Sequence, residues 1–225
     1  MPELKYKRVL LKLSGESFCK TGEFGIDGDC LASIAERIIA VKKTGTQVAI
    51  VVGGGNFLRG ETFSKASHIP RHTADYMGML ATVINACALQ ETLEKLQQPT
   101  RVLSAIEVSA ICEPFIRRKA LKYLDDGTIA ILAGGTGNPF FSTDTCAALR
   151  ASELDVNLLI KGTKVDGVYD DDPKKNPKAV LLEKLSYKDV FTGNLKVMDH
   201  AAVSLCSESK IPIIFPAHNC FISSF

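Results

Sequence analysis

The sequence predicts a three-layer α/β/α sandwich with a mostly parallel central sheet. Short runs of apolar residues alternate along the chain with segments whose apolar residues recur at helical spacing. Strands without polar alternation are buried on both faces, which is typical of parallel sheets covered by helices. The chain has 225 residues, 46% of them apolar, so it can bury a large core.

The expected elements follow one another without a clear break. Apolar runs predict strands at 9–13, 48–52, 102–103, 128–132 and 156–160. Helical spacing predicts helices across 31–39, 77–89, 117–124 and 143–151. A polar stretch at 170–177 interrupts the pattern, but apolar patterning resumes at 181–191 and 198–205. We therefore expect residues 1–225 to form a single domain.

Composition excludes several classes of protein. The net charge of +2 gives no sign of a nucleic-acid or membrane-surface protein. The seven cysteines form no CxxC pair, and their odd number favours reduced, buried thiols. The N-terminus lacks an apolar signal core, and no apolar run approaches the roughly 20 residues that span a bilayer. These features predict a cytoplasmic protein. A zinc site at His68 and His72 is not expected, because the HExxH pattern is absent.

Two glycine-rich loops, each at the end of an apolar strand, are the strongest functional signal. The first is Gly53–Asn56 and the second is Gly134–Pro139. A strand that leads through glycines into a helix presents free N–H groups and a helix dipole to an anion. Two such loops predict two phosphorylated ligands and transfer between them. Neither loop has a Walker or a dinucleotide-binding pattern, so a Rossmann oxidoreductase is disfavoured.

Charged residues adjoin these loops. Lys12 and Lys161 lie at strand ends, where the ligand crevice of an open α/β sheet is found. Arg59 follows the first loop and suits bidentate contact with phosphate. Asp144 follows the second loop, either as a site residue or simply as a helix cap. The acidic run 170–172 has two open interpretations, a Mg²⁺ site or a solvated turn.

Six stretches together resemble the bacterial UMP kinases of the amino acid kinase superfamily. They run in family order from about residue 7 to residue 214 and are residues 11–16, 53–56, 74–82, 135–141, 163–169 and 195–199. The segments 75–79 and 137–141 separate UMP kinases from relatives that act on glutamate, aspartate or carbamate. The resemblance implies a carbamate kinase-like sandwich, a homohexamer, and the reaction ATP + UMP → ADP + UDP in pyrimidine nucleotide biosynthesis.

The resemblance also implies a set of site residues. Those for ATP are Lys12, Leu13, Ser14, Gly15, Gly55, Arg59, Thr163, Tyr169 and Asp172. Those for UMP are Gly54, Asp75, Thr136, Gly137, Asn138, Pro139, Phe140, Phe141, Ser142 and Thr143. A region linked to activation by GTP matches Lys20, Thr21, Gly22, Glu23, Phe24 and Gly25. Inhibition by UTP is a further family trait. The tail 215–225 departs from the family pattern, and we expect it to be atypical.

A mechanism follows from the chemistry of the acceptor. A phosphate monoester has a second pKa of about 6, so UMP is largely dianionic at neutral pH and needs no protein base. Lys12 and Lys161, assisted by Arg59 and by the Mg²⁺ that enters with ATP, would stabilise the transferring group, and Asp144 would orient the lysines. We assign no protein ligand to Mg²⁺. Two alternatives stay open: a kinase for an acidic substrate, and a catalytically silent nucleotide-binding regulator.

Overall fold

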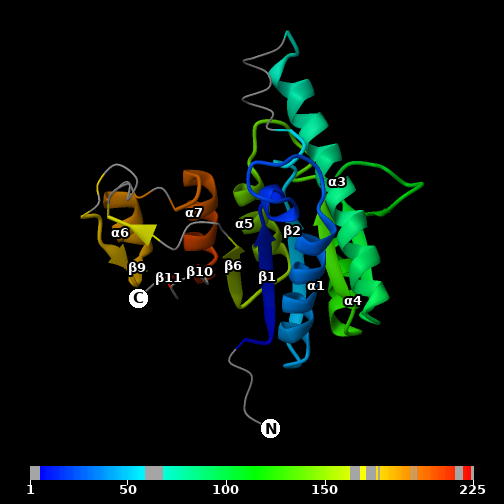
Figure 1. Cartoon of the computed structure of the whole chain (residues 1–225). Helices are drawn as coiled ribbons and strands as arrows, with labels where there is room; N and C mark the ends of the chain where they lie inside the picture. Colours follow the sequence, from blue (N-terminus) through cyan, green and yellow to red (C-terminus); the bar gives the residue numbers. More distant parts are fainter. Residues whose placement is uncertain are drawn as a thin grey trace.

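The central sheet extends across the whole molecule, from β9 beside α6 at one end to the region of α3 and α4 at the other (Figure 1). The computed structural model describes residues 6–58, 68–162, 168–170, 176, 178–193, 195 and 197–215, and the backbone of 220–223. Within these residues the sheet has nine strands in the order β4-β3-β5-β2-β1-β6-β10-β11-β9. All neighbours are parallel except β10 and β11, which pair antiparallel.

The strands in chain order are β1 (Arg8–Leu13), β2 (Gln47–Val52), β3 (Thr100–Ser104), β4 (Glu113–Pro114), β5 (Ile129–Ala133), β6 (Leu158–Gly162), β7 (Val168–Tyr169), β8 (Leu181–Leu182), β9 (Lys184–Ser186), β10 (Ile213–Phe215) and β11 (Cys220–Ser223). β7 and β8 form a separate antiparallel pair. The helices are a 3₁₀ turn η1 (Gly15–Phe18), α1 (Gly28–Lys42), α3 (Arg71–Lys95), α4 (Arg117–Asp125), α5 (Thr143–Glu153), α6 (Tyr187–Thr192) and α7 (His200–Glu208).

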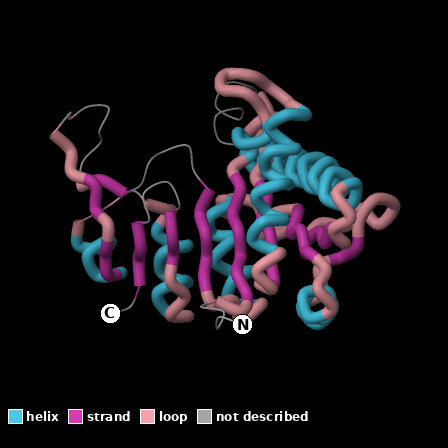
Figure 2. The backbone as a smooth tube through the Cα atoms, turned by 60° about the horizontal axis from the view of Figure 1, so that its bottom comes forward, coloured by secondary structure: helices cyan, strands magenta, loops and turns pink. Residues whose placement is uncertain are grey.

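Helices cover both faces of the sheet, so the layers are those that the apolar runs predict (Figure 2). On one face, α4 and α5 pack against the central strands β1, β2 and β5, while α7 packs against α5 and α6 against β9, and their apolar side chains form one buried cluster. On the other face, α1 and α3 pack against the alternate residues of the same strands. Here an apolar cavity of about 960 Å³ remains between α1 and strands β1, β6 and β10. The α/β/α fold class is confirmed.

The predicted elements are confirmed with small shifts at their ends. The strand expected at 156–160 is β6, which starts at Leu158 and continues to Gly162, because Asn157 instead exchanges hydrogen bonds with Arg8. The long helix expected at 77–89 is α3, which extends from Arg71 to Lys95. In the atypical tail, β11 inserts between β10 and β9. Among the described residues, no helix is both long and apolar enough to cross a membrane.

Candidate active site

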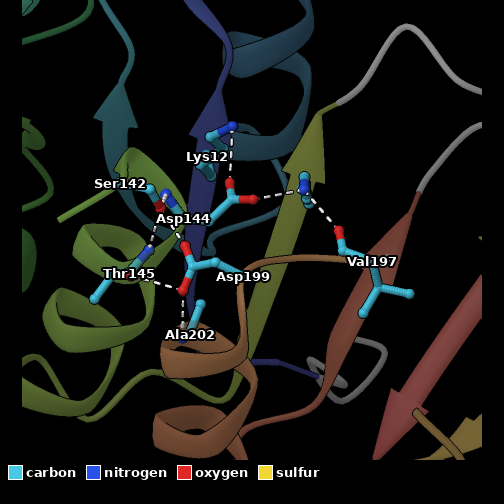
Figure 3. A network of polar contacts seen from close by, with 8 residues as sticks. Lys12, Ser142, Asp144, Thr145, Val197, Asp199 and Ala202 are labelled. Carbon is cyan, nitrogen blue, oxygen red and sulfur yellow. Dashed lines mark hydrogen bonds and ion pairs between the residues drawn. The ribbon is translucent and has the colours of Figure 1, made fainter. Parts of the chain in front are cut away.

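Two lysines and one aspartate form a charged centre at the carboxyl edge of the sheet. Lys12 of β1 and Lys161 of β6 are register partners in neighbouring parallel strands, so their side chains leave the same face. Asp144, in the first turn of α5, pairs with both lysines, and Figure 3 shows its contact with Lys12. Its two carboxylate oxygens lie 2.9 Å from Nζ of Lys12 and 2.7 Å from Nζ of Lys161. The fold thus brings together three of the predicted catalytic residues.

The three side chains are largely buried, with exposures of 11%, 15% and 13% for Lys12, Asp144 and Lys161. Burial by itself raises the pKa of Asp144, but the two ammonium groups outweigh it, so the net pKa is lowered. Burial lowers the pKa of Lys161, and Asp144 partly opposes this effect. With all three groups ionised, the centre carries one net positive charge, which favours an anionic ligand.

The N-terminal turn of α5 is fixed by a network of hydroxyls and a second carboxylate. Ser142 caps the helix, accepting hydrogen bonds from the backbone N–H groups of Asp144 and Thr145 at 3.0 and 3.1 Å. The hydroxyls of Ser142 and Thr145 both donate to the carboxylate of Asp199 (Figure 3). Lys161 also donates to the carbonyl of Val197 at 2.7 Å. The segment before α7 therefore contacts Lys161 directly and also contacts the helix turn that carries Asp144.

A cavity of about 380 Å³ opens beside the N-terminal turn of α5. Both glycine loops line it, Gly54 and Gly55 from one side and Gly135 and Thr136 from the other. A Cβ atom at Gly54 would lie 2.6 Å from the carbonyl oxygen of Gly78, so only glycine allows this loop to approach α3 so closely. The two loops that the sequence predicts to bind phosphorylated ligands therefore meet at one cavity.

Helix α3 holds both glycine loops through two buried polar residues that the sequence reading missed. The amide of Asn85 donates to the carbonyl of Gly53 and to the side chain of Asn56, each at 2.7 Å. The hydroxyl of Thr82, one helical turn earlier, accepts a hydrogen bond from the N–H of Gly134 at 2.7 Å. Polar residues on the core-facing side of a long helix are the sequence signal that could have identified them.

Asp75 connects α3 to the second loop from inside the cavity. Its carboxylate accepts a hydrogen bond from the N–H of Phe140 at 2.9 Å and two from Nε of Arg71 at 2.8 and 2.9 Å. The Arg71 guanidinium also lies 5.8 Å from the centre of the Phe140 ring. Phe140 has a φ of 72°, a left-handed conformation that costs energy for a bulky residue. These contacts hold the loop in that conformation.

The structure places the other predicted site residues in different parts of the fold, and some lie outside the described residues. Six of the predicted UMP residues line the cavity, namely Gly54, Asp75, Thr136, Phe141, Ser142 and Thr143. Leu13 ends β1, and Ser14 and Gly15 follow it. Gly15 packs so tightly on Gly55 that a Cβ atom on Gly15 would lie 2.4 Å from the Gly55 nitrogen. Tyr169 lies in β7 and pairs with Leu181 of β8. Arg59, Thr163 and Asp172 lie outside the described residues.

The segment Lys20–Gly25, matched to GTP activation, adjoins the first glycine loop. The N–H of Gly25 donates to the carbonyl of Asn56 at 3.1 Å, and the side-chain amide of Asn56 donates back to the Gly25 carbonyl at 2.7 Å. The rings of Phe24 and Phe57 meet edge to face, with centroids 5.5 Å apart. A movement of this segment would therefore act on the first glycine loop through these direct contacts.

Two buried cysteines lie on α5 and α7. Burial raises the pKa of Cys146 to about 11. Burial also raises the pKa of Cys206 to about 12, with further contributions from the carboxylates of Asp144 and Asp199. The six cysteines whose side chains the structure describes are all free thiols, as their spacing predicts.

The sheet, the glycine loops and the charged centre define an α/β protein of the kind that binds phosphorylated ligands at the carboxyl edge of its strands. The chain belongs to the amino acid kinase family, whose sequence model matches residues 7–215.

Three proteins to which the chain is similar are all named as uridylate or UMP kinases. The chain is 51% identical over 213 residues to the chloroplastic uridylate kinase PUMPKIN of Arabidopsis thaliana; the match covers 95% of the chain but 63% of that relative's length. The solved structure of UMP kinase from Bacillus anthracis is 35% identical, with a TM-score of 0.92 over 97% of this chain and 96% of that one. UMP kinase from Ureaplasma parvum is 34% identical, with a TM-score of 0.91 over 98% and 100%.

Proposed function

We propose that this protein is a UMP kinase, which transfers the γ-phosphoryl group of ATP to UMP and releases UDP and ADP. The observation that carries the proposal is the buried centre of Lys12, Asp144 and Lys161 beside a cavity that both glycine loops line. The likeness to two UMP kinases over nearly their whole length adds support. We further propose that residues 1–225 act as one domain, since a single sheet joins the described residues from Arg8 to Ser223.

In the proposed mechanism, a phosphate oxygen of UMP attacks the γ-phosphorus of ATP in line with the bond to the leaving ADP oxygen. The new P–O bond forms as the bond to ADP breaks, and the negative charge moves onto the leaving oxygen. Lys12 and Lys161 stabilise this charge from a position that is already fixed before the reaction. Arg59 assists, and the Mg²⁺ that accompanies ATP is part of the substrate.

Asp144 orients the lysines and does not act as a base. Both of its oxygens are engaged by ammonium groups, and its lowered pKa makes it a poor proton acceptor. The acceptor has no proton that must be removed, because its phosphate is already dianionic at neutral pH. The chemistry therefore requires positioning and charge stabilisation alone.

The predicted UMP residues around the cavity would select the acceptor. Asp75 offers carboxylate oxygens to the ribose hydroxyls, and the loop 136–141 offers backbone groups to the base. A site built to hydrogen-bond one base edge rejects others strongly. We therefore expect UMP to be preferred well above CMP and dCMP.

A panel of nucleoside monophosphates with ATP and Mg²⁺, read by ADP formation, tests the proposal. Rapid turnover with UMP is the expected result. Equal turnover with CMP would contradict the proposed base selection. Turnover with glutamate, aspartate or carbamate in place of UMP would support the acidic-substrate alternative, and binding of UTP or GTP without any turnover would support the silent regulator.

Assembly and regulation are proposed on the same basis. We propose a homohexamer with activation by GTP through Lys20–Gly25 and inhibition by UTP. An apolar stripe on α3 supports an assembly surface, because Leu80 and Ile84 are 49% and 51% exposed and Tyr76 and Met77 accompany them. The hydrogen bonds between Gly25 and Asn56 would transmit the effect of GTP bound at Lys20–Gly25 to the first glycine loop.

For the location of the protein we propose the cytoplasm, on the strength of its free thiols. The name of the Arabidopsis relative places that protein in the chloroplast. Imaging the tagged protein in its own cells would decide between these compartments.

A further inference from the structure

Asp199 lies at the start of α7, next to the first turn of α5. Its carboxylate caps α7 by accepting a hydrogen bond from the N–H of Ala202 at 2.9 Å. The same carboxylate accepts hydrogen bonds from the hydroxyls of Thr145, at 2.8 Å, and Ser142 (Figure 3). One side chain thus joins the N-terminal turns of two helices, whereas a cap needs to satisfy only its own helix.

The backbone of the same segment holds Lys161. The carbonyl of Val197, two residues before Asp199, accepts a hydrogen bond from Nζ of Lys161 at 2.7 Å. Asp144 holds that ammonium group from the other side, also at 2.7 Å. The contacts close a ring that runs from Lys161 to Asp144, through the first turn of α5 to Asp199, and back through Val197 to Lys161.

We propose that Asp199 is a positioning residue for phosphoryl transfer, which fixes the N-terminal turn of α5 so that Asp144 holds Lys161 against the reacting phosphates. This inference rests on the proposed function and adds a residue that contacts neither substrate. Thr145, which is buried, is its partner on α5. Positioning of this kind matters because a displacement of about 1 Å can reduce a rate by roughly 100-fold.

The charge of Asp199 has a second effect on the same ammonium group. Three charged groups from different elements act on Lys161, namely Asp144 from α5, Lys12 from β1 and Asp199 from the start of α7. Burial lowers the pKa of Lys161, Asp144 and Asp199 raise it, and Lys12 lowers it. Removing the negative charge of Asp199 therefore moves the deprotonation of Lys161 to lower pH.

Asp199→Asn tests the proposal, since it keeps the size of the side chain and removes its charge. We expect kcat to fall by roughly 10- to 100-fold, with KM values for UMP and ATP close to wild type. The alkaline limb of the kcat–pH profile should move to lower pH. The matched control is Asp189→Asn in α6, where the exposed carboxylate accepts hydrogen bonds from Ser186 N–H and hydroxyl groups in a similar helix-start role. The control should leave kcat and its pH profile unchanged.

A second pair of variants keeps the proposal testable if Asp199→Asn folds poorly. Thr145→Val removes one donor to Asp199 and leaves its charge, so kcat should fall without a shift of the alkaline limb. Thr145→Ser keeps the hydroxyl and should restore kcat. Wild-type kcat and an unmoved alkaline limb in Asp199→Asn would overturn the proposal, as would wild-type kcat in Thr145→Val. Failure of the wild-type protein to turn over any acceptor would instead overturn the proposed function.

Discussion

At the scale of single residues, Lys161 carries the heaviest expected role. It lies opposite Lys12 in the sheet register and makes contacts of 2.7 Å with both Asp144 and Val197. Replacement by Met removes the ammonium group but retains most of the side chain. We expect kcat to fall by roughly 10²- to 10³-fold, the loss typical of one transition-state contact. Steady-state kinetics measures it, and Lys188→Met on the exposed side of α6 is the control.

Replacement of Asp144 should affect stability as well as activity. Asp144→Asn leaves two largely buried ammonium groups without their counter-charge. We expect a loss of about 3 kcal/mol in the free energy of unfolding, the low end for a buried pair because 11–15% exposure remains. Urea denaturation measures it. Asp126→Asn, which breaks the exposed pair with Lys122, should cost less than about 1 kcal/mol.

The same carboxylate makes stability depend on pH. Because the folded pKa of Asp144 lies below the ordinary value of 3.8, the unfolded chain takes up the proton first as the pH falls. The stabilisation is therefore complete above that value and is lost as the pH falls through the folded pKa. Asp144→Asn should flatten this part of the acid-denaturation curve, and an identical slope in both proteins would contradict the assignment.

The sequence revealed the charged residues of the site but not their supports. Lys12, Lys161 and Asp144 stand next to strand ends and glycines, so local pattern indicates their chemistry. Asp199 acts through contacts with Ser142 and Thr145, which exist only because α5 and α7 pack side by side. A contact between segments so far apart in the chain has no local signature.

At the scale of elements, α3 fixes the shape of the cavity. Asn85→Ala removes the donors to the carbonyl of Gly53 and to Asn56, in a fully buried place. We expect a loss of about 1–3 kcal/mol in stability, the cost of leaving such groups unsatisfied. The KM for UMP should also rise because the first glycine loop loosens. Urea denaturation and steady-state kinetics measure the two effects.

The control for Asn85→Ala is Thr92→Val, further along α3, where the lost hydrogen bond stays within the helix. It should leave the KM for UMP at its wild-type value. If Asn85→Ala changed stability but not KM, the link between α3 and the loop would have no role in binding.

Helix α3 shows why the sequence could predict the elements but not which face of each helix is buried. Continuous apolar runs made the central strands β1, β2 and β5 easy to place. On α3, however, the apolar residues at helical spacing include Leu80 and Ile84, which face outward, while polar Thr82 and Asn85 face inward. Helical spacing identifies the helix, but the loops that it must hold decide which face is buried.

At the scale of the whole molecule, the apolar stripe of α3 bears on assembly. Leu80→Glu combined with Ile84→Glu places charges on the stripe without entering the core. We expect the variant to sediment as a smaller species than the wild-type protein, because burying these charges in an interface is costly. Val180→Glu, at an exposed apolar residue outside α3, is the control. Unchanged sedimentation of the double variant would place the interface elsewhere.

The buried thiols have a practical consequence. Cys206 is fully buried on α7, which packs against α5, and its surroundings strongly oppose thiolate formation, so an alkylating reagent can modify it only when the packing around α7 opens. The rate of its alkylation therefore measures how often the packing of α7, the helix next to the lysine centre, opens. Substrates that stabilise the assembled centre should lower the alkylation rate of Cys206. Mass spectrometry of the labelled peptide can measure this rate without any measurement of turnover.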